Sequence, residues 1–171
     1  MRGGNYRRYV YHTMLFLICI LLYLWQNSIN AFPEIAGLRA IPVIPFVICV
    51  TMFNPETAGF VYGFAAGMLM DISWSKVSGF NTTILFVLCI ICGLLIQFLL
   101  NRTPATALLL SGMGCFLYFF VYWLCFHQLA GVTDGAYSLM IRYMPMAIYS
   151  WLFTLPFYIF VGYMTRKLKN D

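Results

Sequence analysis

Two carboxylates near the middle of the chain are the first candidates for chemistry. Glu56 and Asp71 would be an acid and a base for catalysis if their side chains met. The segment between them reads as one helix, and at about 1.5 Å per residue it separates them by about 22 Å. Paired-acid catalysis uses separations of about 5–9.5 Å. We therefore expect the two acids at opposite ends of a helix, with no shared reaction.

The other reactive side chains also lack partners at catalytic spacing. His12 precedes and His127 follows long apolar runs, which places them on opposite sides of the expected bundle, each as an interfacial hydrogen bonder. No Ser, Thr or Tyr stands in a nucleophile motif with a base beside it. Cys89 and Cys92 form a CxxC inside an apolar run, without the second pair that a zinc site needs. The sequence predicts no enzyme activity, no metal and no cofactor.

The composition says what kind of molecule must hold these residues. Of 171 residues, 63% are hydrophobic and 9% are charged, against about 45–50% and about 25% in soluble domains. The chain therefore reads as an integral membrane protein, with no room for a soluble catalytic or nucleotide-binding domain. Its net charge of +5 comes from bases clustered at the two ends, which suits membrane orientation and predicts no nucleic-acid partner.

The apolar runs predict an all-α, polytopic fold with about six transmembrane helices in a single domain, 1–171. The expected helices cover residues 9–25, 40–53, 56–70, 80–100, 105–129 and 139–164. The second contains Pro42 and Pro45, so it is either a kinked span that begins earlier, near Ile35, or a re-entrant piece packed within protein. Asn54 is expected to cap the third helix, and Pro145 and Pro156 to bend the last.

The basic residues give this bundle an orientation. With both termini in the cytoplasm, seven bases fall on the inner side and three on the outer side, namely Arg39, Lys76 and Arg142. The positive-inside rule therefore favours an even number of crossings and cytoplasmic termini. No Lys, Arg, Asp or Glu falls near the centre of a predicted helix, which disfavours an ion-coupled transporter or proton pump.

A stripe of small residues is the clearest motif. Gly59, Gly63, Gly67 and Asp71 recur every four residues, so they lie along one face of a helix. Glycines there let another helix approach closely. Two alternatives stand: packing against a helix of the same chain, which we favour, or a surface for a partner.

Asp71 closes the stripe near the membrane boundary. A carboxylate there needs water, a hydroxyl, a helix N-terminus or a cation, and Lys76 and Arg142 are candidate cations on the same side. It is either a structural acid that fixes the following loop or a residue of functional importance.

These residues are similar to a known family signature. Gly63-Phe64-x-x-Gly67-Met68-x-x-Asp71, followed by Gly79, resembles the motif of MreD, the rod-shape-determining membrane proteins of bacteria. Arg142-Tyr143-Met144-Pro145 and the later Leu155-Pro156-Phe157 resemble that family's last helix.

The resemblance implies a non-catalytic scaffold of the bacterial cytoplasmic membrane. Such proteins work with an MreC-type membrane protein, with RodA and with a class B penicillin-binding transpeptidase in lateral wall synthesis. Gly59, Gly63, Gly67, Asp71, Gly79, Arg142 and Pro145 are the expected helix-contact or partner-interaction residues. The family's fold is similar to that of the substrate-binding subunits of energy-coupling-factor vitamin transporters. Such a subunit is the alternative function, and Asn81, Thr82, Thr83 and Asp71 would contribute to its pocket.

Overall fold

The computed structural model describes residues 3–28, 40–54, 57–74, 77, 79–128 and 139–169. Every regular element in these ranges is a helix. The α-helices are α1 (Gly3–Asn27), α2 (Val43–Phe53), α3 (Thr57–Trp74), α4 (Phe80–Phe98), α5 (Pro104–Trp123), α7 (Met144–Leu152) and α8 (Thr154–Lys169). Two wider π-helical turns, η1 (Leu124–Gln128) and η2 (Leu139–Tyr143), precede α7.

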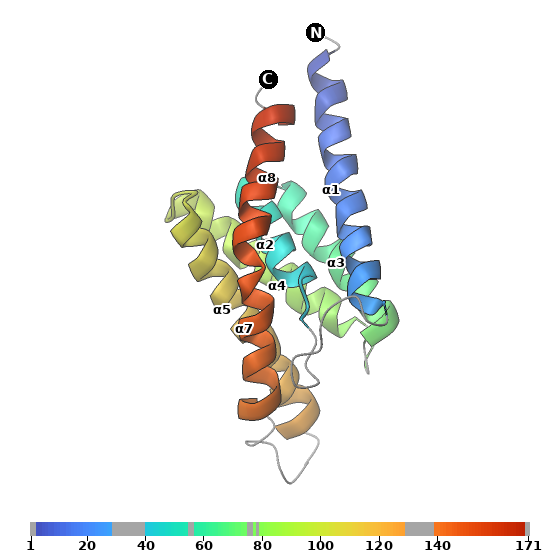
Figure 1. Ribbon diagram of the computed structural model, residues 1–171, viewed down its shortest axis with the longest axis vertical. Coiled ribbons are helices and arrows are strands. Elements are labelled where there is room, and N and C mark those ends of the chain that lie inside the picture. Colours follow the sequence, from blue (N-terminus) through green and yellow to red (C-terminus); the bar gives the residue numbers. More distant parts are fainter. Residues whose placement is uncertain are drawn as a thin grey trace.

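The helices form an elongated bundle with both chain ends at the same extremity (Figure 1). The first residues of α1 and the last residues of α8 lie there, whereas η1 and η2 lie at the opposite extremity. α4 crosses the bundle obliquely behind α2 (Figure 1).

Four helical segments are long and apolar enough to cross a membrane. They are Tyr9–Asn27, Phe80–Phe98, Pro104–His127 and Leu139–Lys167. Two further apolar helices, Val43–Phe53 and Gly59–Ile72, are shorter. The structure therefore contains all six apolar segments expected from the sequence, and four of them have the length of a membrane span.

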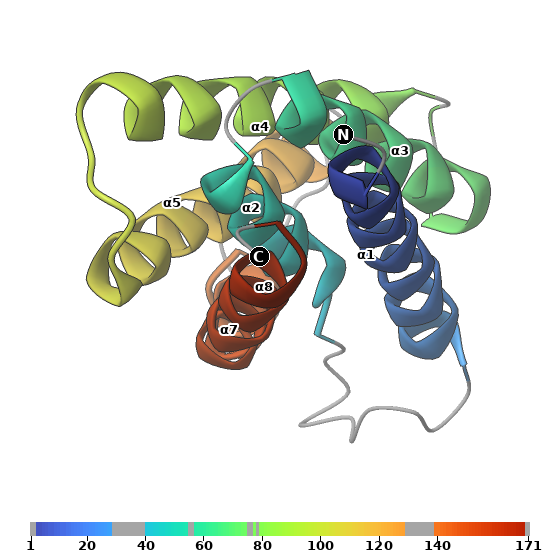
Figure 2. The same cartoon turned by 90° about the horizontal axis from the view of Figure 1, so that it is seen from above.

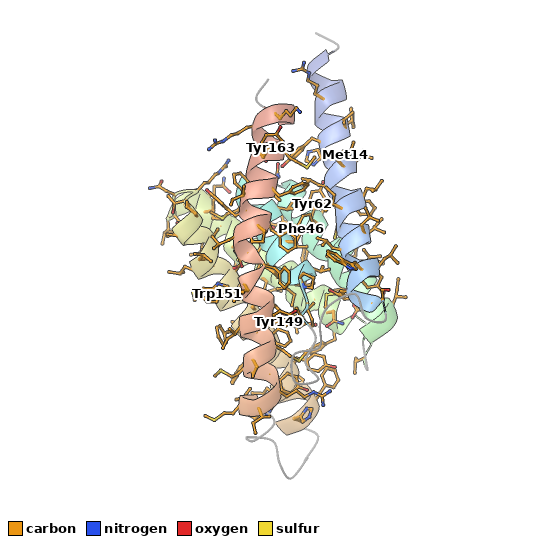
Figure 3. All side chains as sticks on the ribbon, in the orientation of Figure 1. Met14, Phe46, Tyr62, Tyr149, Trp151 and Tyr163 are labelled. Atoms are coloured by element: carbon orange, nitrogen blue, oxygen red, sulfur yellow. The ribbon has the colours of Figure 1, made fainter. Side chains whose placement is uncertain are left out.

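α2 is the core of the bundle. It packs against α1, α3, α4, α5, α7 and α8, and every residue from Val43 to Met52 is buried. Seen from above, α2 lies between α1, α4, α5 and α8 (Figure 2). Phe46 is central (Figure 3), with its ring 5.5 Å from that of Phe157 in α8.

The length of α2 bears on whether the second apolar segment spans the membrane. Its 11 residues extend only about 16 Å, roughly half of a bilayer core. A helix that is apolar all round is typical of burial in protein. Pro45 does not kink it, because the first-turn residues of a helix have no N–H partner to lose. The described part of this segment is therefore a short helix packed within protein. Whether a kinked span begins near Ile35 stays a prediction, because that residue lies outside the described residues.

Several predicted boundaries need correction. The third helix does not end at residue 70 but continues to Trp74, so Asp71 lies inside a helix. Asn54 caps the C-terminus of α2; its amide donates to the Tyr11 hydroxyl at 2.8 Å and the Val50 carbonyl at 3.1 Å. Its predicted role as N-cap of the third helix stays a prediction, because residues 55 and 56 lie outside the described residues. Glu56 lies outside the described residues.

The last two predicted helices are also divided. The predicted helix over 105–129 changes to the wider turn η1 after Trp123. The one over 139–164 starts as η2 and is interrupted at Phe153, three residues before Pro156, which has no N–H for the carbonyl of Leu152. Pro145 lies in the first turn of α7, directly after η2, so the winding changes from π-helical to α-helical at this proline.

Candidate functional site

The glycine stripe of α3 faces helices of the same chain. A Cβ atom added at Gly59 would lie 2.7 Å from the Asn54 carbonyl oxygen, beyond the end of α2. At Gly63 it would lie 2.6 Å from Cys89 Sγ in α4. At Gly67 it would lie 2.3 Å from the Thr82 Cα atom. Real Cβ atoms do not approach so closely, so glycine is required for these contacts. The stripe is therefore occupied by α2 and α4.

Asp71 binds the N-terminus of α4. Its Oδ1 accepts from the Asn81 backbone N–H at 2.9 Å, and its Oδ2 accepts from the Thr82 N–H at 3.1 Å. The Thr82 hydroxyl also donates to Oδ2. The first N–H groups of a helix lack partners within it and carry partial positive charge. Asp71 therefore caps α4 from the neighbouring helix.

Gly79 completes this junction through its backbone. It precedes α4 with φ +86°, a left-handed conformation that costs other residues about 1–2 kcal/mol. An added Cβ would meet nothing within 4 Å. Glycine is therefore favoured at position 79 by its backbone conformation, whereas in the stripe it is favoured because a Cβ atom has no space. The Thr83 hydroxyl donates a hydrogen bond to the Gly79 carbonyl at 2.8 Å. Lys76, a candidate cation for Asp71, lies outside the described residues.

A buried polar contact links this junction to a neighbouring pocket. Asn81 is fully buried, and its Oδ1 accepts from the Tyr118 hydroxyl of α5 at 2.7 Å. Its amide nitrogen finds no hydrogen-bond partner within the described part of the chain. A buried donor of this kind costs about 1–3 kcal/mol when unsatisfied. The link joins Asp71 to Tyr118 through the first residues of α4.

The pocket is a cavity of about 280 Å³ between α5, α7 and the wide turns. Its polar lining comes from Tyr118, Tyr122, His127, Arg142 and Tyr143, and its apolar lining from Ile41, Phe119 and Met146. One guanidinium, one imidazole and three phenol groups converge there. Such a set could bind an anionic or aromatic small molecule.

The wide turns supply the most polar of these groups. His127 lies in η1 and Arg142 in η2. His127 Nδ1 and the Tyr143 hydroxyl are 3.3 Å apart, and Arg142 lines the pocket together with Tyr122 and Tyr143. π-Helical turns are frequent at functional sites. Arg142 was expected as a site residue, and the structure places it here, away from the α3–α4 contact.

The tyrosines of the pocket were missed by sequence reasoning. Tyr118, Tyr122 and Phe126 recur every four residues and form a row of ring contacts, at 6.4 Å and 4.7 Å between centroids. This spacing was the available signal, but aromatic residues are also common as interface anchors. The expected pocket residues Asp71, Thr82 and Thr83 instead bind each other or nearby backbone.

The remaining candidates are accounted for by structural contacts. His12 Nδ1 lies 3.1 Å from the Tyr62 hydroxyl, which donates to the His12 carbonyl at 3.0 Å. Cys89 and Cys92 are free and buried. Among the described residues, no three His, Cys, Asp or Glu side chains gather as metal ligands.

Comparison of the chain with protein-family models, with curated proteins and with solved structures gave no match. Function is therefore inferred from the residues and contacts of this chain.

Proposed function

We propose that the chain is a non-catalytic membrane scaffold of the bacterial cell-elongation machinery. In this proposal it lies in the cytoplasmic membrane with both termini inside, and it binds an MreC-type membrane protein. RodA and a class B penicillin-binding transpeptidase belong to the same assembly. The residue-level resemblance to MreD is the starting point.

One observation carries the proposal. Gly63, Gly67, Asp71 and Gly79, the residues of the signature, all act on the junction between α3 and α4. Two permit close contact, one caps the second helix and one shapes the turn before it. A motif whose residues all fix the packing of one helix pair is typical of a structural role. A chemical motif would instead point its side chains at a ligand.

The proposal places the partner away from the glycine stripe. The stripe contacts α2 and α4, so a partner would bind a different face of the bundle. Gly63 and Gly67 would then affect partner binding indirectly, through the shape of the α3–α4 junction.

Purification of the tagged chain from its native cells in mild detergent tests the proposal. We expect recovery of a single-span protein with a periplasmic coiled coil, and rounding of rod-shaped cells upon depletion. Recovery of an ATPase pair with a bound small molecule, without any change of cell shape, would contradict it.

A second function has its own supporting observation. The cavity of about 280 Å³ with Arg142, His127 and three tyrosines is what a substrate-binding subunit of an energy-coupling-factor vitamin transporter would need. Arg142→Gln tests this second function. A substrate-binding subunit would lose its ligand with this change, and unchanged ligand binding would contradict the second function.

A further inference from the structure

A second polar groove lies at the extremity of the bundle that holds both termini. Its volume is about 590 Å³, and it runs between α8 and the turn that joins α4 to α5. The lining includes Phe53, Arg102, Tyr158, Tyr163, Thr165 and Arg166. Figure 3 shows Tyr163 on the upper part of α8. Neither the scaffold proposal nor the pocket around Arg142 uses this groove.

Specific contacts hold the two sides of the groove together. The Tyr158 hydroxyl donates to the Arg102 carbonyl at 3.0 Å and ties the α4–α5 turn to α8. The Phe53 ring packs 5.3 Å from the Tyr158 ring, and a Cβ added at Gly162 would lie 3.1 Å from Phe53 Cζ. The groove therefore has an apolar floor, with an arginine from each of two distant segments beside it.

The charged side chains that the structure describes at the groove are all positive. The side chains of Arg102 and Arg166 are exposed, and the Lys167 ammonium lies 5.7 Å from the Tyr163 ring centroid. Asp71 is the one acidic residue within the described ranges. It binds the far end of α4, about 27 Å from the C-terminus of that helix at about 1.5 Å per residue. No described carboxylate is therefore near enough to neutralise the arginines.

The neighbouring surface of α8 is apolar. Leu155, Ile159 and Tyr163 follow one another at four-residue spacing, are 44%, 67% and 61% exposed, and lead to Arg166 on the same face. α8 belongs to a segment long enough to span a membrane. Acyl chains would cover the apolar residues, and the arginines would lie at the depth of lipid phosphates.

We propose that this groove binds the phosphate headgroup of an anionic phospholipid. The guanidinium groups of Arg102 and Arg166 donate to the phosphate oxygens, because the planar donor fork of arginine matches phosphate geometry. One acyl chain lies along Leu155 and Ile159. This inference is independent of the proposed function, since it holds for either a scaffold or a transport subunit.

Native mass spectrometry of the full chain in mild detergent, titrated with phosphatidylglycerol, tests the proposal. The double variant Arg102→Gln/Arg166→Gln should bind this lipid about 10–30-fold more weakly, at about 1 kcal/mol for each arginine. The control is Arg7→Gln, which removes an exposed charge at the same extremity but outside the groove. It should change binding less than twofold. Unchanged elution on size exclusion establishes that each variant is folded.

Three results would overturn the proposal. Equal losses in Arg7→Gln and the double variant would indicate a diffuse positive surface. Undiminished binding by the double variant would exclude the arginines. Displacement of the lipid by millimolar inorganic phosphate would indicate a site for a soluble anion.

Discussion

The pairs α3–α4 and α5–α7 both have glycine at their contact. We call α3–α4 the closed pair, and we call α5–α7, which two cavities adjoin, the open pair. In α3, Gly67 lies against the backbone of Thr82, so the two helices meet main chain to main chain. In α5, Gly112 lies against the Trp151 ring of α7, whose Nε1 donates to the Leu108 carbonyl at 2.7 Å. At this glycine, α5 therefore meets a side chain of α7 and not its main chain.

Two cavities lie beside the second pair. The pocket of about 280 Å³ and an apolar groove of about 410 Å³ lined by Met113, Phe116 and Leu117 both adjoin α5 and α7. The group that meets the glycine therefore differs between the two pairs: it is main chain in the closed pair and a side chain in the open pair.

The largest effect is expected from Gly67→Ala. The new Cβ would lie 2.3 Å from Thr82 Cα, and main chain cannot rotate away, so we expect a loss of about 3 kcal/mol. The matched change Gly112→Ala would meet only the Trp151 side chain, at 3.1 Å, and should cost about 1 kcal/mol or less. Unfolding of the purified variants in detergent measures both. Equal losses would remove the distinction between the two pairs.

Asp71→Leu should have the next largest effect, about 2–4 kcal/mol, because it leaves the first N–H groups of α4 without an acceptor. Asp71→Asn keeps an acceptor and should cost about 1 kcal/mol. The same unfolding measurement compares the two. Severe loss with Asn as well would show that the charge, and not the hydrogen bonding, is what α4 requires.

Gly79→Ala should cost about 1 kcal/mol, since only the positive φ opposes a side chain there. Gly79→Asn should cost less, because asparagine tolerates this conformation better than most residues. If Ala and Asn were both neutral, the turn before α4 would not need the left-handed backbone.

The smallest effect on stability is expected from Arg142→Gln, within about 0.5 kcal/mol, because this side chain is exposed at the open pair. A stability loss as large as that of Gly67→Ala would mean that the pocket is part of the framework.

The closed pair could largely be predicted from the sequence, because its requirements are local. Four-residue spacing of glycines specifies close contact, and a carboxylate at the end of such a stripe must have a partner. The partner itself could not be chosen among a hydroxyl, a helix N-terminus and a cation. The partner of Asp71 depends on how α4 packs against α3, which is a feature of the tertiary structure.

The open pair could not be predicted in the same way. Tyr118, Tyr122 and Tyr143 are residue types that also anchor helices in lipid, so only their convergence distinguishes them. That convergence depends on the wide turns η1 and η2. The short length of α2 was visible in the sequence, but its burial on all sides results from six neighbouring helices.

The central claim is that the glycine stripe contacts α4 of the same chain, and a disulfide tests it most directly. A Cβ added at Gly63 would lie 2.9 Å from Cys89 Cβ, closer than the about 3.5–4.5 Å of a disulfide, so a shift of α3 away from α4 by less than about 1 Å would bring the two Cβ atoms to bonding geometry. With the other five cysteines replaced by alanine, Gly63→Cys should therefore form an intramolecular disulfide with Cys89 in membranes under mild oxidation. Phe64→Cys, at the exposed neighbouring position, should not. A thiol that stays free in the Gly63→Cys variant, or disulfide-linked dimers in place of the internal bond, would contradict the account.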